Sequence, residues 1–436
     1  MLRTILRNRV VANAGWLIAG KVAQMLISFV VGLLTARYLG PSNYGLINYA
    51  GAYTAFFASV CTLGINSVLV KELLDHPQQE GELLGTSLLL RAVSSVLSAL
   101  MMIGISAVAD ADEPTTFLVV VLTSLVLLFQ IFDTFQYWFQ AKLKSKVTAV
   151  ASLVAYSCTA AYKIFLLATG KSVVWFALAT SLDYFCYGAL LLLGYWSLHG
   201  MRLCASKACA KRLLKSSHHF ILPGLMVAIY GYTDKIMLKL MLTETETGYY
   251  STAVALCSIW NFVLAAVIDS VFPTIMEAHG KDDALYLRRN RQLYAFVFYL
   301  SAAVSVVFTL LGEPIIGLLY GQQYLPAAAP LRVITWYTAF SYLGAARNAW
   351  VVCEKKQSSL KYLYAASALL NVAMNFLLIP GLGATGAAIA SLATQVSSVF
   401  LFPLLFRPYR QNTKLMLQAI ALRGVFPGRR KTKESE

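Results

Sequence analysis

The chain has 436 residues, of which 58% are hydrophobic and 13% charged, and its mean hydropathy is +0.65. A soluble protein carries about twice that charged fraction, so the composition excludes an ordinary water-soluble domain. The formal net charge of +16 would suit a nucleic-acid-binding protein, but the positive charges lie in short connections between apolar segments, and we expect no nucleic-acid partner.

Apolar segments follow one another along the chain, each with the about 20 residues that a membrane-crossing helix needs. They predict an all-α membrane protein with about 12 transmembrane helices. The predicted spans are 13–38, 43–66, 83–109, 115–138, 147–169, 172–198, 217–242, 247–273, 291–312, 328–352, 358–379 and 384–406.

Charged residues sort between the two sides of these predicted spans. One side holds the N-terminal segment, the connection 198–217 and the tail after 406, which are rich in Lys and Arg. The other side is acidic, with Asp110, Asp112, Glu113, Glu244, Glu246 and Glu313. Positively charged connections stay in the cytoplasm, so we expect a multi-pass inner-membrane protein with both termini cytoplasmic.

The connection 198–217 divides the predicted spans six and six. A shift of 203 positions supports two halves, because it places Leu39, Gly45, Ala50 and Ala52 on Leu242, Gly248, Ala253 and Ala255. Halves with an even number of helices share one orientation, which makes this a parallel repeat. We expect an N-terminal lobe at 1–210, a C-terminal lobe at 211–410 and a basic tail at 411–436. Within that tail, 415–425 is either an amphipathic helix on the membrane surface or disordered.

Two motifs resemble nucleotide-binding sites without their context. The G-x-G-x-x-G pattern at 381–386 follows an apolar segment and has no acidic residue about 20 positions later, so it predicts a tight turn between spans. Gly170, Lys171 and Ser172 match the end of a phosphate-binding loop, but Phe165 stands where its first glycine belongs. The cysteines and histidines match no common zinc spacing. We therefore expect no cofactor, no metal and no enzyme activity.

Charges inside the predicted spans are the most informative residues. An Arg or Lys at a helix centre costs roughly 2.5–3.5 kcal/mol on insertion scales, so most of these side chains should face the bundle interior. Two alternatives are snorkelling to the interface, which we expect for Arg37 and Lys239, and internal ion pairing. The cations are Lys21, Arg37, Arg91, Lys163, Lys235, Lys239, Arg332 and Arg347, against Asp133, Asp183, Asp234 and Asp269. The excess of cations predicts an interior that attracts an anion.

Aromatic and amide side chains gather at the end of the fourth predicted span. An interfacial belt and a sugar-binding surface both remain open as explanations. The residues are Phe129, Gln130, Phe132, Phe135, Gln136, Tyr137, Trp138, Phe139 and Gln140, and Trp175, Tyr184 and Tyr187 raise the same question.

Several segments together resemble one family. They are GPSNYG at 40–45, DKIM at 234–237 before GYYS at 248–251, LYGQQYL at 319–325, and NFLLIP at 375–380 before GAAIA at 386–390. In order and spacing they are similar to bacterial polysaccharide exporters of the Wzx type, within the multidrug/oligosaccharidyl-lipid/polysaccharide flippase superfamily. The resemblance covers residues 10–410.

The resemblance implies two six-helix lobes around a central cavity that work by alternating access. It also implies a flippase for an undecaprenyl-diphosphate-linked oligosaccharide, used for O-antigen, capsule or exopolysaccharide. A polysaccharide polymerase and chain-length proteins are then candidate partners. The alternatives are an ion-coupled multidrug exporter of the same superfamily, and a polymerase or ligase, which would need a long exterior loop that the sequence does not have.

For this function we expect the diphosphate to be bound by Lys21, Arg91, Lys163, Lys235 and Arg332. An Arg or Lys forms strong charge-assisted hydrogen bonds with phosphate. Asp183, in the middle of the sixth span, is the expected site of coupling to an ion. A plain alternative is that Asp183 only neutralises Lys163.

Overall fold

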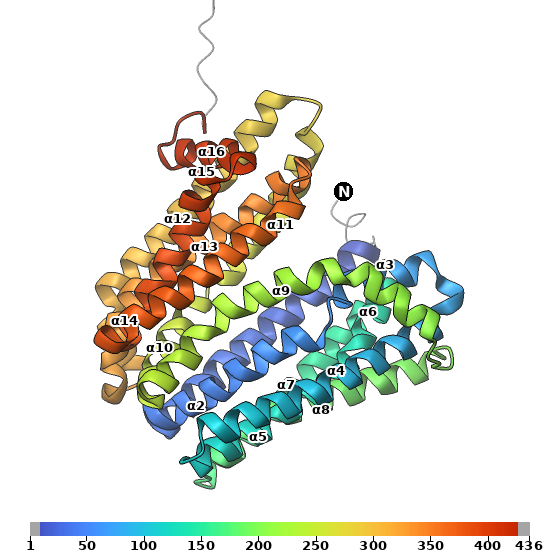
Figure 1. The fold of residues 1–436 in the computed structure, drawn as a ribbon, viewed down its shortest axis with the longest axis vertical. Helices are drawn as coiled ribbons and strands as arrows, with labels where there is room; N and C mark the ends of the chain where they lie inside the picture. The colour runs from blue at the N-terminus through green and yellow to red at the C-terminus, as the bar shows by residue number, and fades with distance from the viewer. Residues whose placement is uncertain (1–8, 426–436) are drawn as a thin grey trace, which may run out of the picture. The chain divides into compact units, whose positions relative to one another are not determined.

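The computed structural model describes the backbone of residues 9–425 and the side chains of residues 24–425 except residue 358. The described chain is helical, with no strand (Figure 1). The predicted all-α class is therefore confirmed.

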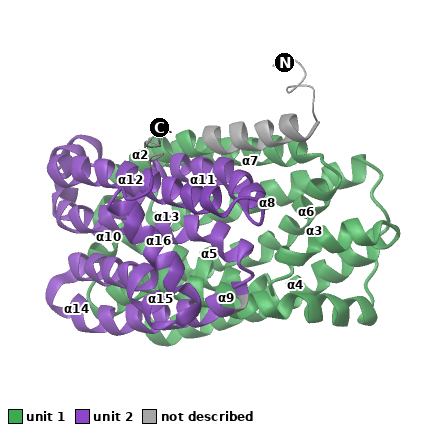
Figure 2. Cartoon of the chain, turned by 90° about the horizontal axis from the view of Figure 1, so that it is seen from above, with its two compact units in different colours: residues 1–248 green, residues 249–436 purple. Residues whose placement is uncertain are grey.

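Two compact units make up the chain, residues 1–248 and 249–436 (Figure 2). The helices of the first unit are α2 (Arg9–Cys61), α3 (Asn66–Asp75), α4 (Glu80–Ala109), α5 (Pro114–Phe129), α6 (Thr134–Ala141), α7 (Ser145–Ala168), α8 (Val173–Ser197) and α9 (Lys207–Met241). Helix α10 (Glu244–Ser258) begins in this unit and ends in the second. The second unit continues with α11 (Asn261–Ala278), α12 (Asp283–Leu319), α13 (Ala328–Cys353), α14 (Leu360–Val396), α15 (Phe402–Leu405) and α16 (Arg410–Ile420).

The predicted twelve crossings agree with these helices. By length and composition, nine helical segments of the described chain can cross a membrane, and two of them, Gln24–Asp75 and Leu360–Leu405, are long enough for two crossings each. Helix α13 adds the twelfth crossing. Both double segments break at a glycine in the left-handed region, Gly40 (φ 73°) and Gly383 (φ 55°). Glycine adopts this conformation without steric cost, which confirms the turn predicted at 381–386.

Helix α9 packs with the first unit, against α2 and α4. The unit boundary at residue 248 therefore lies one helix later than the lobe boundary expected at 210. The lobes were inferred from the internal repeat rather than from packing, and their boundary stays a prediction.

The connection between α8 and α9 lies along the first turns of α4. We call residues 198–206 the strap. A Cβ on Gly81 would lie 2.3 Å from the carbonyl oxygen of Arg202, and a Cβ on Gly85 would lie 2.3 Å from that of Cys204. The amide of Cys204 donates to the Gly81 carbonyl at 3.3 Å. The two glycines thus let the strap approach closer than any side chain would allow.

Helix α16 is amphipathic, which agrees with the expectation of an amphipathic helix in the tail. Its apolar residues Leu415, Met416 and Ala419 are buried in a core that residues of α12 and α13 share. Asn412 donates to the Tyr294 hydroxyl on α12 at 2.7 Å and fixes the register. The structure thus has a docked helix at Arg410–Ile420, while its position at a membrane surface stays a prediction.

The repeat-related glycines Gly45 and Gly248 lie where α2 passes the start of α10. A Cβ on Gly45 would lie 1.7 Å from the Glu244 carbonyl oxygen, and a Cβ on Gly248 would lie 2.1 Å from that of Pro41. A shift of 203 positions relates Pro41 to Glu244 and Gly45 to Gly248, so the contact is reciprocal. The side chain of Ser42 also donates to Glu244 at 2.9 Å.

Replacing Gly45 by alanine should lower the stability of the folded protein by about 1–3 kcal/mol, because the new methyl group meets backbone that cannot rotate away. The matched control is Gly51→Ala on the same helix, where nothing lies within 4 Å of the added Cβ. The control should be neutral or slightly stabilising, since alanine favours helix over glycine. Thermal unfolding of the purified variants in detergent measures both. Equal melting temperatures would contradict the close approach.

Candidate functional site

The first unit contains a buried ion-pair cluster that we call the Lys239 cluster. Nζ of Lys239 lies 2.9 Å from Oδ1 of Asp110 and 2.7 Å from Oε2 of Glu113. Asp110 also accepts from Ser106 at 2.7 Å and from the Tyr49 hydroxyl at 3.1 Å. The lysine side chain is 5% exposed and that of Asp110 is 0% exposed. Of the two alternatives for Lys239, snorkelling and internal ion pairing, the structure shows the ion pair.

Local structure explains this cluster. Asp110 is the C-cap of α4, and Glu113 is the N-cap of α5, so the turn between them presents two carboxylates together. Lys239 lies in the last turn of α9, where a cation is favoured by the helix dipole. Hydrogen bonds from Lys239 and then from Thr116 lower the pKa of Glu113, which keeps this half-exposed carboxylate charged.

Arg91 is the centre of a second buried group, the Arg91 cluster, formed by Arg91, Gln130, Asp133 and Thr134. Arg91 is 2% exposed. Its Nη1 donates to Oγ1 of Thr134 and its Nη2 to the Gln130 carbonyl, both at 2.9 Å. Asp133 interacts with it electrostatically.

The reason for this arrangement is a break in the fourth crossing. Residues Gln130–Asp133 form a 3₁₀ turn between α5 and α6, and such a turn leaves carbonyl groups that α-helical hydrogen bonds would have satisfied. Arg91 satisfies one of these carbonyl groups, that of Gln130. Three buried atoms still lack a hydrogen-bond partner among the described residues: Nε of Arg91, Nε2 of Gln130 and Oδ1 of Asp133.

Asp183 and Lys163 extend the Arg91 cluster across α7 and α8. Oδ1 of Asp183 accepts a long hydrogen bond from Thr159 at 3.5 Å. Asp183 interacts electrostatically with Lys163, and Asp133 interacts with Asp183. Asp133 was recognised as an acidic residue inside a predicted span but was not expected to belong to the site. Its position next to the amides Gln130 and Gln136 could have indicated it.

The remaining predicted ligands lie apart from this cluster. Lys235 is half-buried and donates to Oδ1 of Asn48 at 3.1 Å. Arg332 is on the second unit, where its Nη2 pairs with Glu313 at 3.2 Å, and the side chains are 49% and 58% exposed. The side chain of Lys21 lies outside those that the structure describes. The structure therefore brings Arg91, Lys163 and Asp183 into one region of the first unit.

The aromatic residues noted in the sequence lie in two places, on the fourth crossing and on α8. Phe135, Trp138 and Phe139 are buried in the core with Tyr195, so they form neither a belt nor a sugar-binding surface. Tyr184 and Tyr187 interact electrostatically with Asp133 and Asp183, which puts them beside the Arg91 cluster.

The ion pairs reduce the excess of cations that the sequence suggested. Lys239 and Arg332 are neutralised by acids of the connections, Asp110 with Glu113 and Glu313. Six of the eight cations then remain against four aspartates, an excess of two rather than four. Of these six, only Arg347 belongs to the second unit, where it donates to the Ser398 carbonyl at 3.0 Å.

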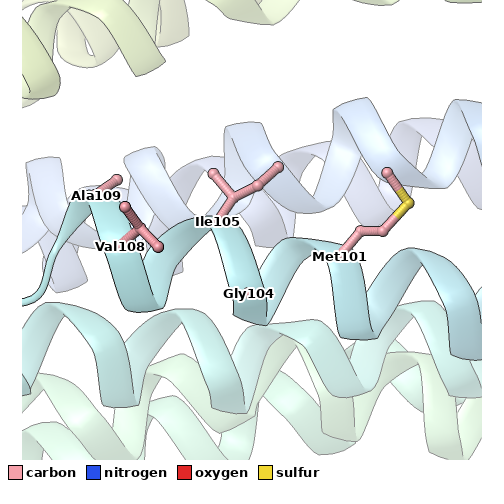
Figure 3. Close-up of a pocket in the computed structure, with 5 residues that line it drawn as sticks. All are labelled: Met101, Gly104, Ile105, Val108 and Ala109. Carbon is pink, nitrogen blue, oxygen red and sulfur yellow. The ribbon is translucent and has the colours of Figure 1, made fainter.

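A shallow hollow of 540 Å³ lies on α4. It is lined by Met101, Gly104, Ile105, Val108 and Ala109, without a charged group (Figure 3). Val108 is 82% exposed, which suits contact with acyl chains. A phosphate would find no donor there.

Replacing Lys239 by methionine should lower stability by about 3–5 kcal/mol, because it leaves Asp110 buried without its counter-charge. Arg332→Met is the matched control, since exposed pairs contribute only about 0–1 kcal/mol. Thermal unfolding of both variants in detergent measures the difference. Equally small losses of stability in Lys239→Met and Arg332→Met would contradict a buried ion pair between Lys239 and Asp110.

The pH dependence has a defined sign. Because the pKa of Glu113 is lowered in the folded protein, its contribution is present at neutral pH and is lost as the pH falls through the lowered value. The Lys239→Met variant should show less of this acid sensitivity.

Comparisons with known proteins agree on one fold. The lipid II flippase MurJ in an inward closed conformation matches with a TM-score of 0.70 and 15% identity, over 93% of this chain and 91% of that chain. An inward-facing multidrug resistance MATE family transporter of the MOP superfamily matches with a TM-score of 0.66 and 13% identity, over 90% and 96%. A MOP superfamily transporter from Pyrococcus furiosus matches with a TM-score of 0.61 and 13% identity, over 95% and 98%.

No curated protein matches the chain in sequence. The model of one family, described as polysaccharide biosynthesis protein, matches residues 10–279. With that match over more than half of its length and the shared fold of the MOP superfamily transporters, this chain belongs to the polysaccharide biosynthesis protein family.

Proposed function

We propose that the protein is a flippase for an undecaprenyl-diphosphate-linked oligosaccharide in the bacterial inner membrane, with its basic connections and both termini in the cytoplasm. The product would serve synthesis of O-antigen, capsule or exopolysaccharide, with a polymerase and chain-length proteins as partners. The family and the likeness to a lipid II flippase support a carrier of this class. The proposal keeps two lobes, 1–210 and 211–410, and alternating access between them.

The observation that carries the proposal is the Arg91 cluster. Hydrocarbon does not solvate a guanidinium or an ammonium group, so a chain that only had to span the membrane would not keep Arg91 and Lys163 there. Neither forms an ion pair within 4 Å in the part of the chain whose side chains are described, and Asp133 and Asp183 interact with them only at longer range. Buried polar atoms without partners indicate a site that a polar ligand can complete.

In this mechanism the diphosphate forms the close ion pairs that Arg91 and Lys163 lack among the described side chains. A guanidinium group binds phosphate through two parallel hydrogen bonds, whereas a lysine acts as a point charge. We assign Arg91 and Lys163 to the diphosphate together with Lys235, Lys21 and Arg332. Release of Arg91 from the Gln130 carbonyl would couple substrate binding to the break in the fourth crossing. Tyr184 and Tyr187 would contact the first sugar.

The second candidate is an ion-coupled multidrug exporter, because MATE transporters share the fold. A drug-like cation is a poor match for a region in which Arg91 and Lys163 form no ion pair within 4 Å among the described side chains. Catalysis by a polymerase or ligase is disfavoured for a different reason, since the family's structural neighbours are transporters and flippases.

Charge reversal at Arg91 should abolish export. Losing a hydrogen bond to a charged group costs about 1.5–3 kcal/mol, or roughly ten- to more than 100-fold in substrate affinity, and reversal adds repulsion. Cells with Arg91→Glu should accumulate lipid-linked oligosaccharide on the cytoplasmic side, as a deletion does, while Arg91→Lys keeps part of the activity.

Two further variants make this test specific. Lys163→Glu should fail in the same way without removing a brace of the backbone, and Lys144→Glu changes an exposed lysine of a basic connection and should export normally. The membrane content of each variant is measured by immunoblot. Normal export by Arg91→Glu at wild-type abundance would remove Arg91 from the site.

Coupling is proposed at Asp183, since a carboxylate in a membrane interior can take up a proton or a sodium ion. Asp183→Asn should retain substrate binding and lose the response of flipping to an imposed ion gradient in reconstituted vesicles. Asp269→Asn is the matched control, an exposed aspartate of the second unit. If gradient-driven flipping by Asp183→Asn is unchanged, Asp183 only neutralises Lys163 and is not the coupling site.

A further inference from the structure

Helices α11 and α12 enclose a groove of 450 Å³ in the second unit. Val267, Val271 and Thr274 come from one face of α11, at spacings of four and three residues. Arg289, Gln292 and Phe296 come from one face of α12 with the same kind of spacing. Since the two helices follow each other through a short connection at 279–282, residues near that connection face each other across one end of the groove.

Polarity changes along the groove. The end next to the connection holds Arg289, Gln292 and Thr274, and Nη1 of Arg289 donates to the carbonyl of Thr274. This bond fixes the guanidinium group at the mouth and leaves its other N–H groups available. The opposite end is apolar, with Val267 and with Phe296, which is 52% exposed. The groove therefore suits an amphiphile rather than a polar or an apolar molecule alone.

The polar end carries uncompensated positive charge. Arg288, Arg289 and Arg291 lie within one turn of α12, and none of the three pairs with a carboxylate in the part of the chain whose side chains are described. Nε of Arg288 and Nε of Arg291 are buried without a hydrogen-bond partner there. The N-terminus of α12 is capped by Asp282 and carries Asp283 in its first turn, so the positive charge at this end comes from the arginines alone. An anion is the complementary ligand.

We propose that this groove binds one acidic glycerophospholipid of the leaflet that faces the basic connections. Its phosphate contacts Arg289 and Gln292, and an acyl chain lies along Val271, Val267 and Phe296. Guanidinium groups bind phosphate in a bidentate manner, and basic pockets between membrane helices bind anionic head groups. The site lies on the second unit, apart from the Arg91 cluster, and its lipid is not the cargo.

The chain's own tail is the competing occupant. Nε2 of Gln292 donates to the Val425 carbonyl at 3.0 Å, so the backbone passes the edge of the groove. The segment that follows, 426–436, contains Arg429, Arg430, Lys431 and Lys433 against Glu434 and Glu436. Like charge opposes its insertion beside three arginines, which favours the lipid.

Native mass spectrometry of the full-length protein in detergent tests the proposal. Phosphatidylglycerol is added to delipidated protein, with phosphatidylcholine as the neutral comparison, and the bound fraction is titrated. We expect one tightly held phosphatidylglycerol in the wild type. The double variant Arg289→Gln, Gln292→Ala should bind it about tenfold more weakly or worse, since a charge-assisted contact is lost.

Three matched variants separate the groove from its surroundings. Val271→Trp fills the apolar part while keeping every charge, and it should also lose the lipid. Lys281→Gln removes an exposed charge at the same end and should bind normally, as should Arg429→Gln, Arg430→Gln. Melting temperatures confirm that each variant is folded.

Four results would overturn the proposal. They are wild-type affinity in Val271→Trp, equal weakening by Lys281→Gln and by the Arg289 variant, equal binding of phosphatidylcholine, and a large change on neutralising the tail. The last result would assign the groove to the segment 426–436.

Discussion

Lipid solvates neither charges nor free backbone groups, and each charged side chain inside the helices must therefore be satisfied by protein. The Lys239 cluster meets this condition by joining the ends of α4 and α9 and the start of α5 through one ammonium group. Arg91 meets it by bracing the 3₁₀ break between α5 and α6. These two solutions fix the neighbours of α4, which are α9 and α5 at its end and the break between α5 and α6 at Arg91.

The same condition connects structure with the proposed transport. A fully neutralised interior has no reason to bind an anion, and the Lys239 cluster is close to that state. The Arg91 cluster is not, since its buried Nε of Arg91 and Oδ1 of Asp133 are without partners among the described residues. A carrier needs such a difference: charges that hold the fold have fixed partners, and charges that bind cargo exchange theirs.

Sequence reasoning found what depends on local chemistry. Twelve crossings follow from runs of apolar residues, and the breaks at Gly40 and Gly383 follow from a glycine beside a proline-containing stretch. It missed what depends on partners distant in sequence. Lys239 was expected at the interface because Asp110, 129 positions away, is not visible as its partner. Likewise, Phe135 and Trp138 resemble an interfacial belt until Tyr195 and Leu213 are packed against them. Which predicted ligands meet, Arg91 with Lys163 but not with Arg332, is again a tertiary property.

The strap has a mechanical consequence. A free chain of nine residues could extend to about 30 Å and would let α9 move independently of α8. Residues 198–206 cannot do this, because Arg202 and Cys204 lie against Gly81 and Gly85, and the amide of Ser206 donates to Thr86 at 3.1 Å. The strap is bound along α4, so it has no free length to extend. A displacement at the start of α4 is therefore transmitted to the start of α9, because the strap cannot lengthen or bend away to absorb it.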